Sequence, residues 1–204
     1  MKLFSIMILD KGTHTAHCLK VVYDLSSFGY FKRGTIQDFI NMTSRLLVER
    51  TQIGQRQSVK EKEYICHVFV RNDNLAAVCF SDEEYPQKVI HTILTKILED
   101  FTILIPSIPP FVARHFWPEP KKIKDFDGVL ENYLKKYQNP SEADVMMKLQ
   151  AEIDETKIIL HRTMEDLLGR GEKLDDLVEK SAYLKDSSKF FYKTAKKTNS
   201  CCGI

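Results

Sequence analysis

The 204-residue sequence has no apolar run near the about 20 residues that a membrane-spanning helix needs. The nearest is 101–112, which Pro106, Pro109 and Pro110 interrupt. The sequence also has no large excess of charge of one sign, because it contains 30 Lys and Arg residues and 28 Asp and Glu residues, for a net charge of +2. A protein that binds nucleic acid through bulk charge is usually far more basic, so we expect no nucleic-acid partner.

Cysteine is scarce and scattered, with five residues in all. An odd, scattered set does not indicate a disulfide framework. The opening residues Met1-Lys2-Leu3 run straight into a strand-like segment, so we expect no secretory leader. We therefore expect free thiols and a reducing, cytosolic setting.

Signatures of catalysis are missing as well. No histidine pair has metal-ligand spacing, and no glycine-rich loop ends in Gly-Lys-Ser/Thr, so we expect no metal and no cofactor. Cys66-His67 is one nucleophile–base candidate, but neighbouring side chains of a strand point to opposite faces and cannot pair. We predict a buried free cysteine and no enzyme activity. An acyl-transfer enzyme that uses a core cysteine is the weakest alternative, since no base or oxyanion site is evident.

What the sequence does contain is a heptad repeat over residues 146–198 that no proline interrupts. A strict repeat of this length supercoils with other helices and does not fold over a globular core. At 1.5 Å per residue the helix would be a rod roughly 80 Å long. Apart from one arginine, the seam consists of Met146, Leu149, Ile153, Thr156, Leu160, Thr163, Leu167, Leu174, Leu177, Ser181, Leu184, Ser188, Phe191, Ala195 and Thr198.

Arg170 is the exception in the middle of this seam. A buried guanidinium has five N–H donors and no acceptor, so partner helices must bring amides or carboxylates to this layer. The best-attested use of such a layer is to fix register and partner choice. The flanking Gly169 and Gly171 each cost roughly 1 kcal/mol in a helix interior. We therefore predict a helix that is weak alone and becomes ordered on its partners.

The stretches Asp154-Glu155-Thr156-Lys157 and LLGRGEKLDDL (167–177) resemble the R-SNARE motif, and Arg170 falls at that family's central arginine. The resemblance implies a parallel four-helix bundle with three Gln-type SNARE helices, whose glutamines would accept hydrogen bonds from Arg170. The alternative is a generic coiled-coil tether that tolerates a polar residue in its seam.

The first two thirds of the chain predict an α+β domain. Residues 2–9, 17–23, 64–70 and 75–80 have strand patterns, and amphipathic patterns predict three helices. The first helix would be capped by Thr35 and the second would start near Pro86, while the third would carry Phe126 and Tyr133.

The segments Lys2-Leu3-Phe4-Ser5, Asp24-Leu25-Ser26-Ser27-Phe28 and Val70-Arg71-Asn72-Asp73 resemble a longin domain. That resemblance implies a profilin-like, five-stranded antiparallel sheet with helices on both faces, followed by the long coiled-coil SNARE helix. We predict a longin domain over 1–137, an R-SNARE motif over 138–199 and a lipidation tail over 200–204. The proline-rich segment 102–120 departs from the family pattern, and its path stays open.

The tail carries a lipidation signal, because Cys201 lies fourth from the end, as a prenylation box requires. The family pattern implies a prenyl group on one cysteine and a palmitoyl group on its neighbour, and two chains anchor stably where one is marginal. Relatives carry three residues after the second cysteine and this chain has two. Either Cys201 is the prenyl site, or a final residue is missing and Cys202 is. An ordinary terminus with two exposed thiols is the alternative. The lysines that would contact an anionic leaflet are Lys189, Lys193, Lys196 and Lys197.

Together these features predict an R-SNARE that zippers with three Gln-type helices to drive vesicle docking and membrane fusion. The resemblance implies ER–Golgi, intra-Golgi and endosomal or vacuolar transport. It also implies a protein of the cytosol and of the cytoplasmic face of Golgi, ER-derived vesicle and endosomal membranes. The alternative from another class is a lipid-anchored tether or regulatory longin module that does not itself fuse membranes.

Two regulatory hypotheses follow. The longin domain would fold back on the SNARE motif and shield the lipid in a groove at Phe39, Ile40 and Met42, although such a stripe is more often simply core. Phosphate on Ser181 or Ser188 would prevent assembly of the bundle, because it would add charge to a seam that excludes water. The folded-back state would tolerate the charge. The alternative is that these small side chains only allow close packing.

Overall fold

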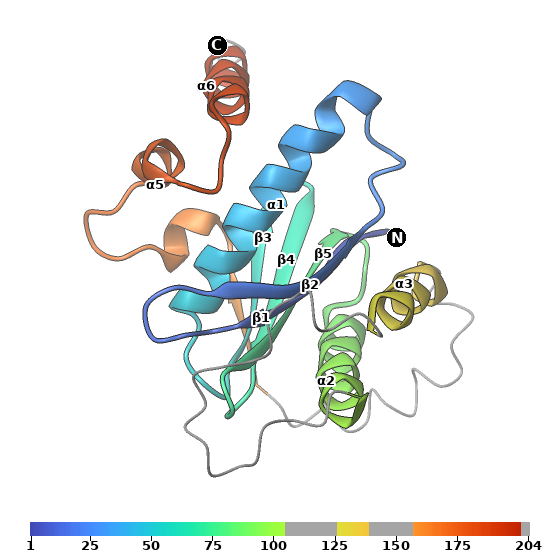
Figure 1. Cartoon of the computed structure of the whole chain (residues 1–204). Coiled ribbons are helices and arrows are strands. Elements are labelled where there is room, and N and C mark those ends of the chain that lie inside the picture. Colours follow the sequence, from blue (N-terminus) through green and yellow to red (C-terminus); the bar gives the residue numbers. More distant parts are fainter. Residues whose placement is uncertain (105–125, 139–156, 201–204) are drawn as a thin grey trace.

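A six-stranded sheet forms the centre of the molecule (Figure 1). The computed structural model describes residues 1–104, 126–138 and 157–200, with side chains to residue 194. The spatial order of the strands is β2-β1-β5-β4-β3-β6, and all neighbours are antiparallel except β3 and β6, which are parallel. The strands are β1 (Leu3–Asp10), β2 (His17–Tyr23), β3 (Arg56–Glu61), β4 (Tyr64–Val70), β5 (Leu75–Asp82) and β6 (Ile158–His161).

Helices cover both faces of this sheet (Figure 1). Helix α1 (Tyr30–Arg50) packs on the face that carries Met7 and Leu9. Helices α2 (Gln87–Leu104) and α3 (Asp127–Lys136) pack on the face that carries Ile6 and Ile8. Because successive strand residues point to opposite sides, the almost wholly apolar β1 supplies both cores.

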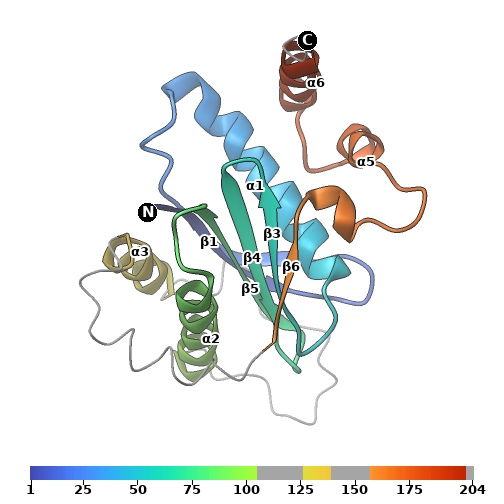
Figure 2. The same ribbon diagram turned by 180° about the vertical axis from the view of Figure 1, so that it is seen from behind.

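The C-terminal segment, residues 157–200, lies on the α1 side of the sheet and along its edge. It consists of β6, the 3₁₀ helix η4 (Met164–Leu167), α5 (Leu174–Lys180) and α6 (Asp186–Ser200). Figure 2 shows β6 beside β3 at the edge of the sheet, with α5 and α6 beyond α1.

The predicted α+β class and the longin-type sheet are confirmed. The longin part supplies the five antiparallel strands, and the sixth strand comes from the C-terminal segment. The predicted cap at Thr35 is wrong, because α1 begins at Tyr30 and includes Thr35. The proline-rich segment predicted from 102 onward lies outside the described residues after 104.

In the free chain the described residues 157–198 do not form one continuous helix, and residues 146–156 lie outside the described part. The continuous helix was predicted for the chain bound to partner helices, and that prediction stays open. The segment is interrupted at 162–163, 168–173 and 181–185. The physical reason is that a lone helix of this kind has no partner for its apolar stripe. The segment instead breaks into short elements that bury part of that stripe on the longin domain.

A buried polar network fixes β3 to α2. The Oγ atom of Ser58 lies 2.8 Å from Nδ1 of His67 and 2.9 Å from Nε2 of His91, and Nε2 of His67 lies 3.1 Å from Oγ of Ser81. Burial lowers the pKa of His67 well below its usual range and that of His91 to about 3, so both rings are neutral. The adjacent Cys66 packs in the core on the opposite face, which confirms that Cys66 and His67 do not pair.

Candidate functional site

The C-terminal segment begins with a strand that continues the sheet. Arg56 pairs with Ile158 and Val59 pairs with His161, in parallel register. The β-branched Ile158 and Ile159 favour the extended conformation. Strand β6 therefore occupies the hydrogen-bonding edge of β3, and these residues cannot belong to a coiled-coil helix at the same time.

The next element, η4, anchors the segment to the core. Met164 is buried among the apolar residues on the α1 side of the sheet. A capping box fixes its start, since the Asp166 carboxylate accepts hydrogen bonds from the backbone N–H of Arg162 at 2.9 Å and of Thr163 at 3.0 Å. These hydrogen bonds lower the pKa of Asp166.

A turn follows at residues 169–172, and it contains the predicted ionic-layer residue. Gly171 has φ +88°, a left-handed conformation that favours glycine. Glu172 holds the turn, because its carboxylate accepts from the backbone N–H of Gly169 and from Nη2 of Arg50, each at 2.8 Å. Arg170 is exposed here. The two glycines that weaken a continuous helix are thus both part of this turn.

Helices α5 and α6 pack on α1. Val178, Leu184 and Met42 form a small buried cluster, and the rings of Phe39 and Tyr192 lie 5.6 Å apart. These contacts bring together two segments that are about 140 residues apart in the sequence, so the fold-back is a tertiary interaction rather than a local turn.

Ser188 adds a polar contact to this interface. Its Oγ donates to Oδ2 of Asp38 at 2.8 Å, and the serine is buried. A phosphate here would place its charge against the Asp38 carboxylate. This contact argues against the expectation that the folded-back state tolerates charge at Ser188. Ser181 is only half-buried, so this argument about a buried charge does not apply to it.

An apolar cavity of about 730 Å³ lies between α1, the sheet and the C-terminal segment. The predicted groove residues Phe39, Ile40 and Met42 all line it. Burial differs among them, because Ile40 and Met42 are buried and Phe39 is half-buried. The other apolar and aromatic lining residues are Phe4, Phe28, Ile36, Val59, Tyr64, Cys66, Phe80, Met164, Leu174, Val178, Phe191 and Tyr192. The polar and charged lining residues are Thr35, Thr43, Glu61, Lys62, Thr163 and Glu165.

The predicted seam residues differ in their burial in the folded-back form. Leu184 and Ser188 are buried; Leu167, Leu174, Leu177 and Ser181 are half-buried; Leu160, Thr163, Arg170 and Phe191 are exposed. The positions Met146, Leu149, Ile153 and Thr156, the side chains of Ala195 and Thr198, and the cysteines Cys201 and Cys202 lie outside the described residues. The heptad pattern missed Met164 and Val178, which are buried although they are not seam positions.

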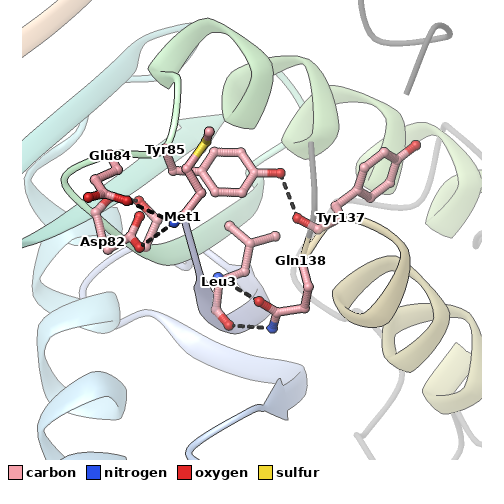
Figure 3. Close-up of polar contacts among 8 residues, drawn as sticks. Met1, Leu3, Asp82, Glu84, Tyr85, Tyr137 and Gln138 are labelled. Carbon is pink, nitrogen blue, oxygen red and sulfur yellow. Dashed lines mark hydrogen bonds and ion pairs between the residues drawn. The ribbon is translucent and has the colours of Figure 1, made fainter. Parts of the chain in front are cut away.

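Side-chain hydrogen bonds hold the end of the longin part in place (Figure 3). The side-chain amide of Gln138 pairs with the backbone of Leu3 as a neighbouring strand would, with N–H···O distances of 3.1 Å and 2.7 Å. The hydroxyl of Tyr85 donates to the carbonyl of Tyr137 at 2.7 Å. The point at which the chain leaves α3 is thereby tied to the start of β1.

Other site types find no support in the described ranges 1–104, 126–138 and 157–200. No group of three or more His, Cys, Asp or Glu residues there is placed to hold a metal ion. None of the helices in these ranges is long and apolar enough to cross a membrane. Burial raises the pKa of the Cys66 and Cys79 thiols, which opposes the thiolate form that a nucleophile needs.

Comparisons with known proteins match two family models to separate parts of the chain. The longin family model, described as a regulated-SNARE-like domain, matches residues 25–115, and the synaptobrevin model matches residues 145–201. The synaptobrevin homolog YKT6 of Debaryomyces hansenii is 46% identical over 207 aligned residues. The corresponding homologs of Schizosaccharomyces pombe and Saccharomyces cerevisiae are 45% and 43% identical, and all three matches cover 100% of both chains. The chain therefore belongs to the longin-domain R-SNAREs of the synaptobrevin family, which are non-enzymatic SNARE-complex proteins of vesicle trafficking.

Proposed function

We propose that this R-SNARE alternates between the folded-back form described above and a parallel bundle with three Gln-type SNARE helices. In the bundle Arg170 would turn inward and donate to glutamines of the partners. Zippering would draw a vesicle and its target membrane together, since burying each large seam side chain yields roughly 1.5–3 kcal/mol.

One observation carries this proposal, namely that β6 and the bundle helix use the same residues. Ile158 to His161 pair with β3 as a strand, although the heptad repeat assigns them to a helix. Leu184 and Ser188 are likewise buried here and would be seam residues in the bundle. The longin domain therefore competes with the partner helices for the same surface, which makes assembly conditional on release.

The lipid anchor is part of the same proposal. Cys201 and Cys202 would carry the prenyl and palmitoyl groups, and the apolar cavity lined by Phe39, Ile40 and Met42 would shelter a lipid chain in the folded-back form. Release would then expose both the chain and the seam. The compartments would be Golgi, ER-derived vesicle and endosomal membranes, with a cytosolic pool of the sheltered form.

The experiment compares Phe39→Glu with Ile53→Glu in the full chain. Phe39 lines the cavity and its ring lies 5.6 Å from that of Tyr192, whereas Ile53 is an exposed apolar residue just past the end of α1. We expect Phe39→Glu to assemble faster with purified Gln-type helices and, in cells, to move from the cytosol to membranes. Ile53→Glu should do neither. A folded Phe39→Glu protein with unchanged assembly and an unchanged cytosolic fraction would contradict the proposal.

A further inference from the structure

The first turn of α1 projects from the molecule with two aromatic side chains in solvent. Phe31 is 96% exposed and Tyr30 is 78% exposed, and their rings are in edge-to-face contact with centroids 5.6 Å apart. Every residue from 29 to 34 is exposed. The aromatic pair belongs neither to the two sheet cores nor to the cavity beside α1.

The charged residues that follow this pair in the first turn of α1 are both cationic. Lys32 and Arg33 follow it directly, and the first turn of α1 has no acidic residue. Arg33 also ties the turn to the preceding loop, because its Nε donates to the Phe28 carbonyl at 3.0 Å and its Nη2 to the Ser26 carbonyl at 3.2 Å. The rings are thus held on an ordered helix end beside two cations.

The shape of this feature favours a bilayer over a protein as its partner. Two side chains on a protruding turn offer far less area than the about 800 Å² per partner of a stable protein interface. A bilayer interface needs no complementary surface, and it favours aromatic rings flanked by Lys and Arg. Anionic head groups would attract both cations.

The position of the turn also favours a bilayer as its partner. Both views of the ribbon place the start of α1 and the end of α6 at the same end of the molecule (Figures 1 and 2). Lys196 and Lys197 belong to the last turns of α6, and the tail cysteines follow the helix in the sequence. A surface that meets the membrane at the start of α1 would therefore leave the end of α6 facing the same bilayer.

We propose that Tyr30 and Phe31 form a wedge that inserts into the interface of an anionic membrane, with Lys32 and Arg33 on the lipid head groups. The wedge acts while the chain is folded back, and it requires neither a lipid on the tail nor release of the C-terminal segment. It sets the orientation of the longin domain on the bilayer, with the start of α1 toward the lipid.

The test is flotation of the full chain, produced without lipid modification, on vesicles of phosphatidylcholine and phosphatidylserine. The wild type should float, and Tyr30→Ser/Phe31→Ser should lower its vesicle partition coefficient roughly tenfold or more. Phe31→Leu should keep most of the binding, and Lys32→Glu should weaken binding only to anionic vesicles. The matched control is Ile53→Ser, because Ile53 is 51% exposed but lies past the opposite end of α1, roughly 30 Å away along the helix.

A spectroscopic probe separates insertion from a change in fold. Phe31→Trp, in a Trp117→Phe background that removes the only other tryptophan, should show blue-shifted emission on anionic vesicles and quenching by brominated lipid. Equal flotation of wild type and the Tyr30/Phe31 double variant, or an unshifted spectrum, would overturn the proposal. So would a wild-type dimer in sedimentation that the double variant lacks, because the rings would then pair two copies. Assembly with Gln-type helices in solution should be unaffected, so failure here is distinguishable from failure of the proposed SNARE cycle.

Discussion

The contact between Ser188 and Asp38 gives a direct way to loosen the folded-back form. Ser188 is 1% exposed, and its hydroxyl donates to the Asp38 carboxylate at 2.8 Å. Hydrogen bonds to charged groups contribute about 1.5–3 kcal/mol, and the half-buried carboxylate places this one near the lower end. Ser188→Ala should therefore raise the population with α6 detached roughly tenfold.

Ser188→Asp should act more strongly, because it replaces the attraction by repulsion. Two carboxylates about 4 Å apart repel by about 4 kcal/mol at an effective dielectric constant of 20. Relaxation of the helix end will relieve part of this energy, and we expect detachment to rise at least about a hundredfold. The matched control is Ser187→Asp, since Ser187 is the adjacent residue and is exposed.

Hydrogen exchange of the α6 amides is the assay. An isolated helix of 15 residues is marginal in water, so α6 should lose protection when it leaves α1. Protection should fall in the order wild type, Ser188→Ala, Ser188→Asp, while Ser187→Asp should match the wild type. If both aspartate variants exchange alike, the Ser188 contact does not hold α6 and the reasoning is refuted.

Four further predictions address the bundle and the fold. The isolated segment 138–199 should be largely disordered by circular dichroism and become helical with Gln-type helices; a stable helix without partners would contradict this. Arg170→Ala should disturb register and disassembly more than bundle stability, and a fall in melting temperature as large as that of Leu174→Ala would oppose it. Ser181→Asp should block assembly with Gln-type helices and Ser181→Ala should not; equal assembly would leave only the packing explanation. Because the two buried histidines stay neutral while the unfolded chain takes up protons, the free energy of unfolding should fall in urea melts from about pH 6.5 to 5, and a flat profile would argue against the network.

Strong local patterns made most of the longin sheet predictable. The segments 17–23 and 64–70 are strands with the bounds expected from their apolar patterns. Strand β3 was missed because its sequence RQSVKE contains one apolar residue. Its buried Ser58 is satisfied by two histidines from β4 and α2, a long-range pairing that no local pattern reveals.

The candidate site was predictable only in part. Periodicity identified which apolar residues of the C-terminal segment need a surface to pack on. It could not show that in the free chain this surface is the chain's own longin domain. Met164 and Val178 are both buried, and they lie on either side of the non-helical residues 168–173. Gly169 and Gly171 were the available signal, since two glycines in a helix interior also indicate a turn.

The pairing of β6 with β3 has a consequence for the chain after it opens. While the segment is folded back, β6 covers the N–H and C=O groups along one side of β3. In the proposed bundle residues 158–161 are helical, and that side of β3 would be an uncovered sheet edge, which other extended chains could use as a template for pairing. The proposed open form would therefore be prone to self-association through the edge of β3, and the fold-back would prevent this by keeping that edge paired.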